Sequence, residues 1–119
     1  MTAVRLILLN LLLLAVSPPA WAHAFLTKAS PPVGSHIPAA PTELTLRFSE
    51  SVEPLFCTIE LLNAAGAAIA VPTPKVADEG QVLIVALPKL PPGTYTVVWH
   101  VTSVDTHKTE GRYQFTIGP

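Results

Sequence analysis

The sequence is poor in sulfur, with a single cysteine, Cys57, and a single methionine, Met1. One cysteine cannot close an intrachain disulfide. Cys57 falls in an apolar alternating segment, so we expect a buried and unreactive thiol. Met1 lies in an N-terminal segment that we expect to be removed. The remaining chain therefore offers no thioether to a soft metal ion.

Charge and long apolar runs are also scarce. Without Arg5, which lies in the same N-terminal segment, the 7 basic residues become 6 (7 − 1) against 8 acidic ones, with no basic cluster. This balance argues against nucleic acid or an anionic membrane as a partner. The longest apolar stretch, Leu6 to Val16, is broken only by Asn10. It is shorter than the roughly 20 residues that a membrane-spanning helix requires.

The first 22 residues have the pattern of a cleavable signal peptide. Arg5 supplies the positive charge, the apolar stretch follows, and Ala20-Trp21-Ala22 provides the small residues that signal peptidase requires. We therefore expect residues 1–22 to be a signal peptide and His23 to become the mature N-terminus. The remaining 97 residues (119 − 22), residues 23–119, fit one domain.

No segment after His23 has helical periodicity, whereas short alternating segments recur between prolines and turn residues. This pattern is typical of an antiparallel all-β domain with two packed sheets in Greek-key order. Trp99 is expected at the centre of its core, and the stretches 72–80, with Val76 as a small anchor, and 103–111 are expected to be loops. The seven expected strands cover residues 24–29, 43–49, 56–63, 67–71, 81–87, 94–102 and 112–117.

Three residues form a candidate metal site. Once cleavage exposes His23, its α-amine and imidazole can chelate one ion. Asp105 and His107 are two positions apart, so in an extended loop their side chains point the same way. Nitrogen and oxygen ligands suit Cu(II), then Ni(II), whereas Zn(II) prefers a tetrahedron. We therefore expect one Cu(II) ion per chain, although an isolated D-x-H motif is more often a solvated turn.

Several segments resemble the CopC family of periplasmic copper-binding proteins. Beside the mature N-terminal His23, they are Leu46 to Glu53 (LRFSESVE), Pro91 to Trp99 (PPGTYTVVW) and Ser103 to His107 (SVDTH). The resemblance implies an immunoglobulin-like β-sandwich or barrel, a periplasmic location, and a Cu(II) site made by His23, Asp105 and His107.

The resemblance also bears on two neighbouring positions. It implies that Glu50 lies near the metal as an accessory group that orients a ligand; the alternative is a solvated loop charge. Family members often have glycine where Thr106 stands, so a left-handed backbone there would be strained.

The function that follows is copper homeostasis or resistance, by sequestering or trafficking Cu(II) without catalysis. A monomer that exchanges copper with an inner-membrane copper transporter is expected. Two alternatives remain open: a copper oxidase or monooxygenase with a histidine brace, and a metal-free interaction module.

His100 is expected to face solvent on its strand. His36 is expected in a solvated loop, with a weak second metal contact or a bridge to another chain as the alternative.

Overall fold

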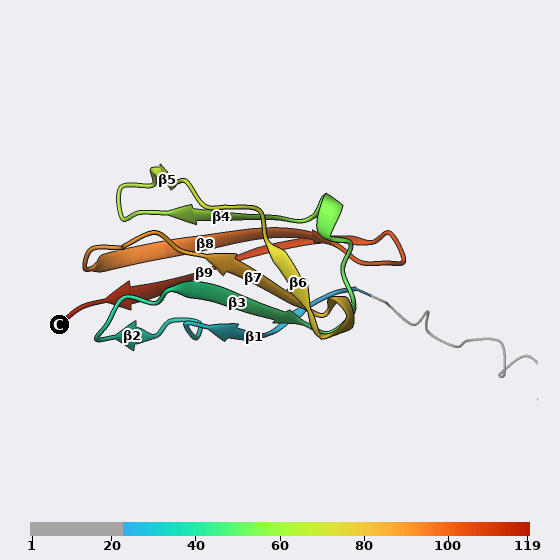
Figure 1. Cartoon of the computed structure of the whole chain (residues 1–119), viewed down its shortest axis with the longest axis horizontal. Helices are drawn as coiled ribbons and strands as arrows, with labels where there is room; N and C mark the ends of the chain where they lie inside the picture. Colours follow the sequence, from blue (N-terminus) through green and yellow to red (C-terminus); the bar gives the residue numbers. More distant parts are fainter. Residues whose placement is uncertain (1–22) are drawn as a thin grey trace, which may run out of the picture.

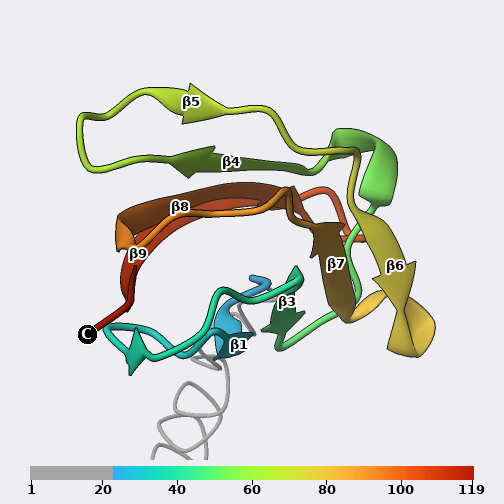
Figure 2. The ribbon, with the colours of Figure 1, turned by 60° about the vertical axis from the view of Figure 1, so that its left-hand side comes forward.

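The computed structural model describes residues 23–119, so the predicted signal peptide, residues 1–22, lies outside the described residues. Within residues 23–119, nine strands form two mostly antiparallel sheets, which face each other as a sandwich (Figures 1 and 2). No helix in this range is long and apolar enough to cross a membrane.

The four-stranded sheet has the order β1-β3-β7-β6, formed by β1 (Leu26–Ser30), β3 (Glu43–Phe48), β7 (Val82–Ala86) and β6 (Lys75–Ala77). The five-stranded sheet has the order β2-β9-β8-β4-β5, formed by β2 (His36–Ile37), β9 (Lys108–Ile117), β8 (Gly93–Thr102), β4 (Thr58–Leu62) and β5 (Ala68–Ile69). Two 3-10 turns, η1 (Pro54–Phe56) and η2 (Asp78–Gly80), lie in the connections.

The core follows from the two-residue periodicity of the long strands, which turns alternate side chains inward. Strand β3 buries Leu44, Leu46 and Phe48, as its alternation predicts. The predicted inward residues of β8 are also buried, and Trp99 meets Phe48 edge to face across the sandwich, with ring centroids 5.3 Å apart. The predicted all-β sandwich and the central position of Trp99 are confirmed.

The last strand begins four residues earlier than the sequence pattern predicts, at Lys108 instead of Arg112. The segment from Lys108 to Gly111 was expected to be loop, but it continues β9 and pairs with β8 from Thr102 to Trp99. Its polar side chains gave no strand signal because one face of this hairpin is in solvent, where alternation with buried apolar residues is not required. The connection between β8 and β9 therefore shrinks to residues 103–107.

Two short edge strands were also missed. Strand β2 pairs in parallel with β9, and β6 pairs antiparallel with β7. Strands of two or three residues at a sheet edge carry little pattern, since few of their side chains reach the core. Val76 of β6 is 38% exposed, so the expectation that it anchors the loop was wrong.

Candidate metal centre

The connection between β8 and β9 is a tight turn that brings two predicted ligands together. The Thr106 N–H donates to the Ser103 carbonyl at 2.9 Å, and the Ser103 N–H donates to the His107 carbonyl at 2.9 Å. This folding places Asp105 Oδ2 3.3 Å from His107 Nδ1.

The expectation of an extended loop was wrong in its geometry. The two side chains meet because the chain turns at Thr106, which has a φ of 75°. This is the left-handed region, which a β-branched residue enters at a cost. The glycine that the family resemblance places there would adopt this backbone without strain.

The N-terminal segment is held to both sheets. The Ser49 hydroxyl, directly after β3, donates to the His23 carbonyl at 3.1 Å and accepts the Phe25 N–H at 2.9 Å. On the other sheet, the Thr109 hydroxyl of β9 donates to the Ala24 carbonyl at 2.8 Å. These bonds fix residues 23–25 across the end of the sandwich, beside the connection between β8 and β9.

As a result, the imidazole rings of His23 and His107 lie 4.9 Å apart between centroids, at an angle of 64°. His107 thus contacts both other predicted ligands, His23 through its ring and Asp105 through Nδ1. Across residues 23–119, however, no three His, Cys, Asp or Glu side chains are grouped closely enough to hold an ion together. In this chain Ala22 precedes His23, so the His23 nitrogen is a peptide amide rather than an amine.

The carboxylate of Asp105 is stabilised in its charged form. The hydrogen bond from the Ser103 hydroxyl, together with a smaller contribution from the His107 imidazole, lowers the pKa of the Asp105 carboxyl below its ordinary value. Asp105 is therefore ionised at neutral pH and presents a hard anionic oxygen. Sequence reasoning assigned no role to Ser103, which is completely buried directly behind the turn.

Glu50 lies between the two chain segments that carry the predicted ligands. Its neighbour Ser49 bonds the His23 carbonyl, and the carbonyl of its other neighbour, Ser51, accepts the Val104 N–H at 3.1 Å. Glu50 itself is half-buried. The backbone of Glu50 thus lies beside the candidate site, and the role of its carboxylate stays a prediction.

The other two histidines lie elsewhere. His36 is part of β2 rather than a loop, and its Nε2 contacts the Gly118 carbonyl. It pairs with Thr116, eight positions along β9 from Lys108, which is about 26 Å of extended strand away from the site. His100 faces solvent as predicted, with its Nδ1 3.1 Å from the Glu110 carboxylate.

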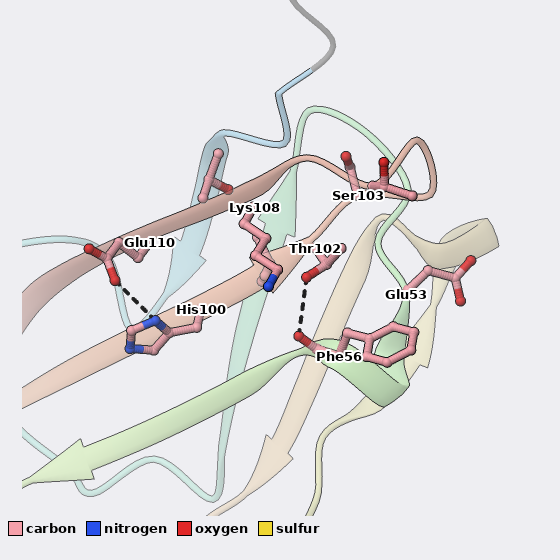
Figure 3. A pocket seen from close by; sticks show the side chains of 10 residues that line it. Glu53, Phe56, His100, Thr102, Ser103, Lys108 and Glu110 are labelled. Carbon is pink, nitrogen blue, oxygen red and sulfur yellow. Dashed lines mark hydrogen bonds and ion pairs between the residues drawn. The ribbon is translucent and has the colours of Figure 1, made fainter.

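Sequence reasoning also missed a hollow of about 730 Å³ on the outer face of β8 and β9. Figure 3 shows Lys108 and the His100–Glu110 pair on its sheet side, with Glu53 and Phe56 on the opposite wall. The hollow shares Ser103 and Thr106 with the turn that carries Asp105 and His107. It is lined by β9 residues that were expected to be loop, and for this reason it could not be predicted from the sequence.

Together, the sandwich and the histidine pair at one end define a small immunoglobulin-like β-protein with a candidate metal centre. A family model described as the CopC domain matches residues 26–118, and the chain belongs to the CopC family.

The relatives include copper proteins. The chain is 35% identical over 121 residues to copper resistance protein C of Escherichia coli, covering 95% of each chain. It is 41% identical over 104 residues to protein YobA of Escherichia coli strain K12, covering 86% of this chain and 84% of YobA. It is also 32% identical to the copper transport protein CutJ of Bacillus subtilis, covering 94% of this chain but 21% of CutJ.

Two solved structures of copper proteins have the same fold as this chain. The crystal structure of CopC from Methylosinus trichosporium OB3b matches with a TM-score of 0.75 and 36% identity, covering 82% of this chain and 95% of that one. The methionine-rich copper resistance protein PcoC from Escherichia coli matches with a TM-score of 0.72 and 29% identity, covering 81% and 99%.

Proposed function

We propose that the processed chain, residues 23–119, carries one Cu(II) ion as cargo in the periplasm and serves copper resistance or homeostasis. Its ligands would be the α-amine and imidazole of His23, the imidazole of His107 and the carboxylate of Asp105. The observation that supports this proposal best is the approach of the His23 and His107 rings to 4.9 Å, from opposite ends of the chain.

The donor chemistry favours copper over other ions. Three nitrogens and one carboxylate oxygen suit the tetragonal geometry of Cu(II), which also binds such ligands more tightly than other divalent first-row metals. Membership of the CopC family and the copper resistance proteins among the relatives support the same ion. His107 lies close to both His23 and Asp105. Cleavage after Ala22 would turn the His23 amide into an amine, which would then bind the same ion as Asp105.

A carrier fits this donor set better than an oxidase or monooxygenase. The Asp105 carboxylate lies 3.3 Å from His107, where it would share the ion. A hard anionic oxygen favours Cu(II) over Cu(I) and so opposes the reduction that oxygen activation requires. Rapid oxygen consumption by the copper-loaded protein with ascorbate would instead support the enzyme.

We propose that Glu50 orients the His23 amine from outside the coordination sphere. Its place between Ser49 and Ser51, which bond the two ligand-bearing segments, supports this role. Changes to such an accessory group typically weaken metal binding 10- to 100-fold. A Glu50→Gln variant with unchanged affinity would instead identify Glu50 as a solvated loop charge.

The proposed partner is an inner-membrane copper transporter, which a single copy of the chain would contact at the site end. The segments at this end carry four exposed apolar side chains, Phe25, Leu55, Phe56 and Val104, which are 57%, 89%, 68% and 55% exposed. Their places beside His23, in η1 and in the connection between β8 and β9 can be followed in Figure 1. The match to about a fifth of the longer CutJ chain supports a transport partner.

The test is a competition titration with Cu(II) on residues 23–119 starting at His23, with electron paramagnetic resonance to count nitrogen ligands. Adding one alanine before His23, or His107→Ala, should lower the affinity by more than about 100-fold, because each removes a direct ligand. His100→Ala removes an exposed imidazole outside the site and is the matched control. Its affinity should remain that of the parent, because His100 bonds neither a proposed ligand nor a residue that holds one.

Two results would overturn the proposal. One is an unchanged affinity in both the extended chain and His107→Ala. The other is a mature protein, identified by mass spectrometry after export, that begins at a residue other than His23.

A further inference from the structure

Ser103 is completely buried, although it is a polar residue, and its hydroxyl lies at the centre of the candidate site. The hydroxyl donates to the Asp105 carboxylate and accepts the His107 N–H at 3.2 Å. It therefore contacts both ligand-bearing residues of the turn at once. A buried hydroxyl has one proton to donate, and here the carboxylate takes it.

The backbone of Ser103 is equally constrained. Its N–H donates to the His107 carbonyl at 2.9 Å, its carbonyl accepts the Thr106 N–H at 2.9 Å, and it forms an isolated bridge with Val52. Ser103 is thus anchored to the chain that leaves β3 as well as to both ends of its own turn. Its hydroxyl occupies a fixed point, from which it sets where the Asp105 carboxylate and the His107 backbone lie.

From this geometry we infer that Ser103 is a positioning residue for the copper site: its hydroxyl holds Asp105 and His107 in the arrangement that accepts the ion. The inference rests on the proposed function. Groups that hydrogen-bond to metal ligands fix the orientation of those ligands. Their loss typically lowers metal affinity 10- to 100-fold even though the ligands remain. The Ser103 hydroxyl thus hydrogen-bonds both the Asp105 carboxylate and the backbone of His107.

The experiment compares Ser103→Ala with Thr102→Val in residues 23–119. Thr102 is the adjacent buried residue, and its hydroxyl bonds the Phe56 carbonyl at 3.4 Å, away from the ligands. Both variants lose one buried hydroxyl and should lose similar stability. Only Ser103→Ala should weaken Cu(II) binding by 10- to 100-fold and alter the paramagnetic resonance spectrum.

A double-mutant cycle with Asp105→Ala separates positioning from general destabilisation. If Ser103 acts through the carboxylate, Ser103→Ala should cost less affinity when Asp105 is already absent. If Ser103→Ala unfolds the domain, the same comparisons are made in a Thr106→Gly background, which relieves the left-handed strain of the turn.

The outcomes distinguish the two proposals. If the parent chain does not bind Cu(II) tightly, the proposed function fails. If the parent binds but Ser103→Ala binds with the same affinity and spectrum, or if Thr102→Val is weakened equally, only the positioning role fails.

Discussion

Gly111 of β9 is expected to tolerate no side chain. It lies opposite Trp99 in the β8–β9 pair, and the indole covers the space that a side chain at residue 111 would need. A Cβ there would lie 2.5 Å from Cζ2 and 2.8 Å from Cε2 of Trp99. The ring cannot easily withdraw, because it is 7% exposed and packs edge to face on Phe48.

Gly111→Ala should therefore lower the free energy of unfolding by about 1–3 kcal/mol, the usual cost of overpacking a core. Because each kcal/mol shifts the melting temperature of such a small domain by about 4–8 °C, the expected loss is roughly 5–20 °C. Calorimetry measures it directly. Trp99 is the single tryptophan of residues 23–119, so its fluorescence reports any displacement of the indole.

Two controls test the cause. Arg112→Ala, at the next position but exposed, should change stability by less than about 0.5 kcal/mol. In a Trp99→Phe background the contacted indole atoms are gone, so the cost of Gly111→Ala should shrink. A Gly111→Ala protein that melts at or above the parent temperature would refute this account of the Trp99–Gly111 packing.

Two further predictions concern a strained turn and the single thiol. Thr106→Gly should relieve about 1–2 kcal/mol of left-handed strain against about 0.5–1 kcal/mol of added chain entropy, so it should leave the melting temperature equal or raise it slightly. Gly34→Ala, at a φ of 70° in open space, should lower it instead. Burial raises the pKa of the Cys57 thiol. A raised folded pKa favours the protonated form, so Cys57 stabilises the fold below the ordinary thiol pKa and loses this contribution as the pH rises through the folded value. Alkylation at pH 8 should therefore be much slower in the folded than in the unfolded chain, and equal rates would contradict the burial of the thiol.

The sequence could predict the parts of the fold in which side-chain chemistry repeats along the chain. The segment Glu43 to Phe48 alternates apolar with polar residues, and it forms β3 with its apolar side chains inward. The start of β9 carries no such signal, because Lys108 to Gly111 are polar or lack a side chain. Its strand structure arises from pairing with β8, which is a tertiary contact.

The same distinction applies to the candidate site. Residue types and spacing select His23, Asp105 and His107 as candidate ligands, since few residues other than histidine and acidic residues bind hard or borderline metal ions. The two-residue spacing correctly predicted that Asp105 and His107 are neighbours, but the predicted extended backbone was wrong. The two side chains meet because the chain turns at Thr106. The buried hydroxyl of Ser103 could not be recognised from the sequence, where nothing distinguishes it from the other five serines.

The position of His23 depends on both sheets at once. Chain termini usually fray, and a ligand on a frayed terminus would have to be ordered when the metal binds. Here Ser49 after β3 and Thr109 in β9 hold residues 23–25, and Thr109 is 85 positions from its partner Ala24. Thr109 is also two residues from His107, so the strand that carries one imidazole also fixes the segment that carries the other. Folding therefore orders residues 23–25 in advance, so under the proposed function a ligand on His23 would bind the ion with little further loss of chain entropy.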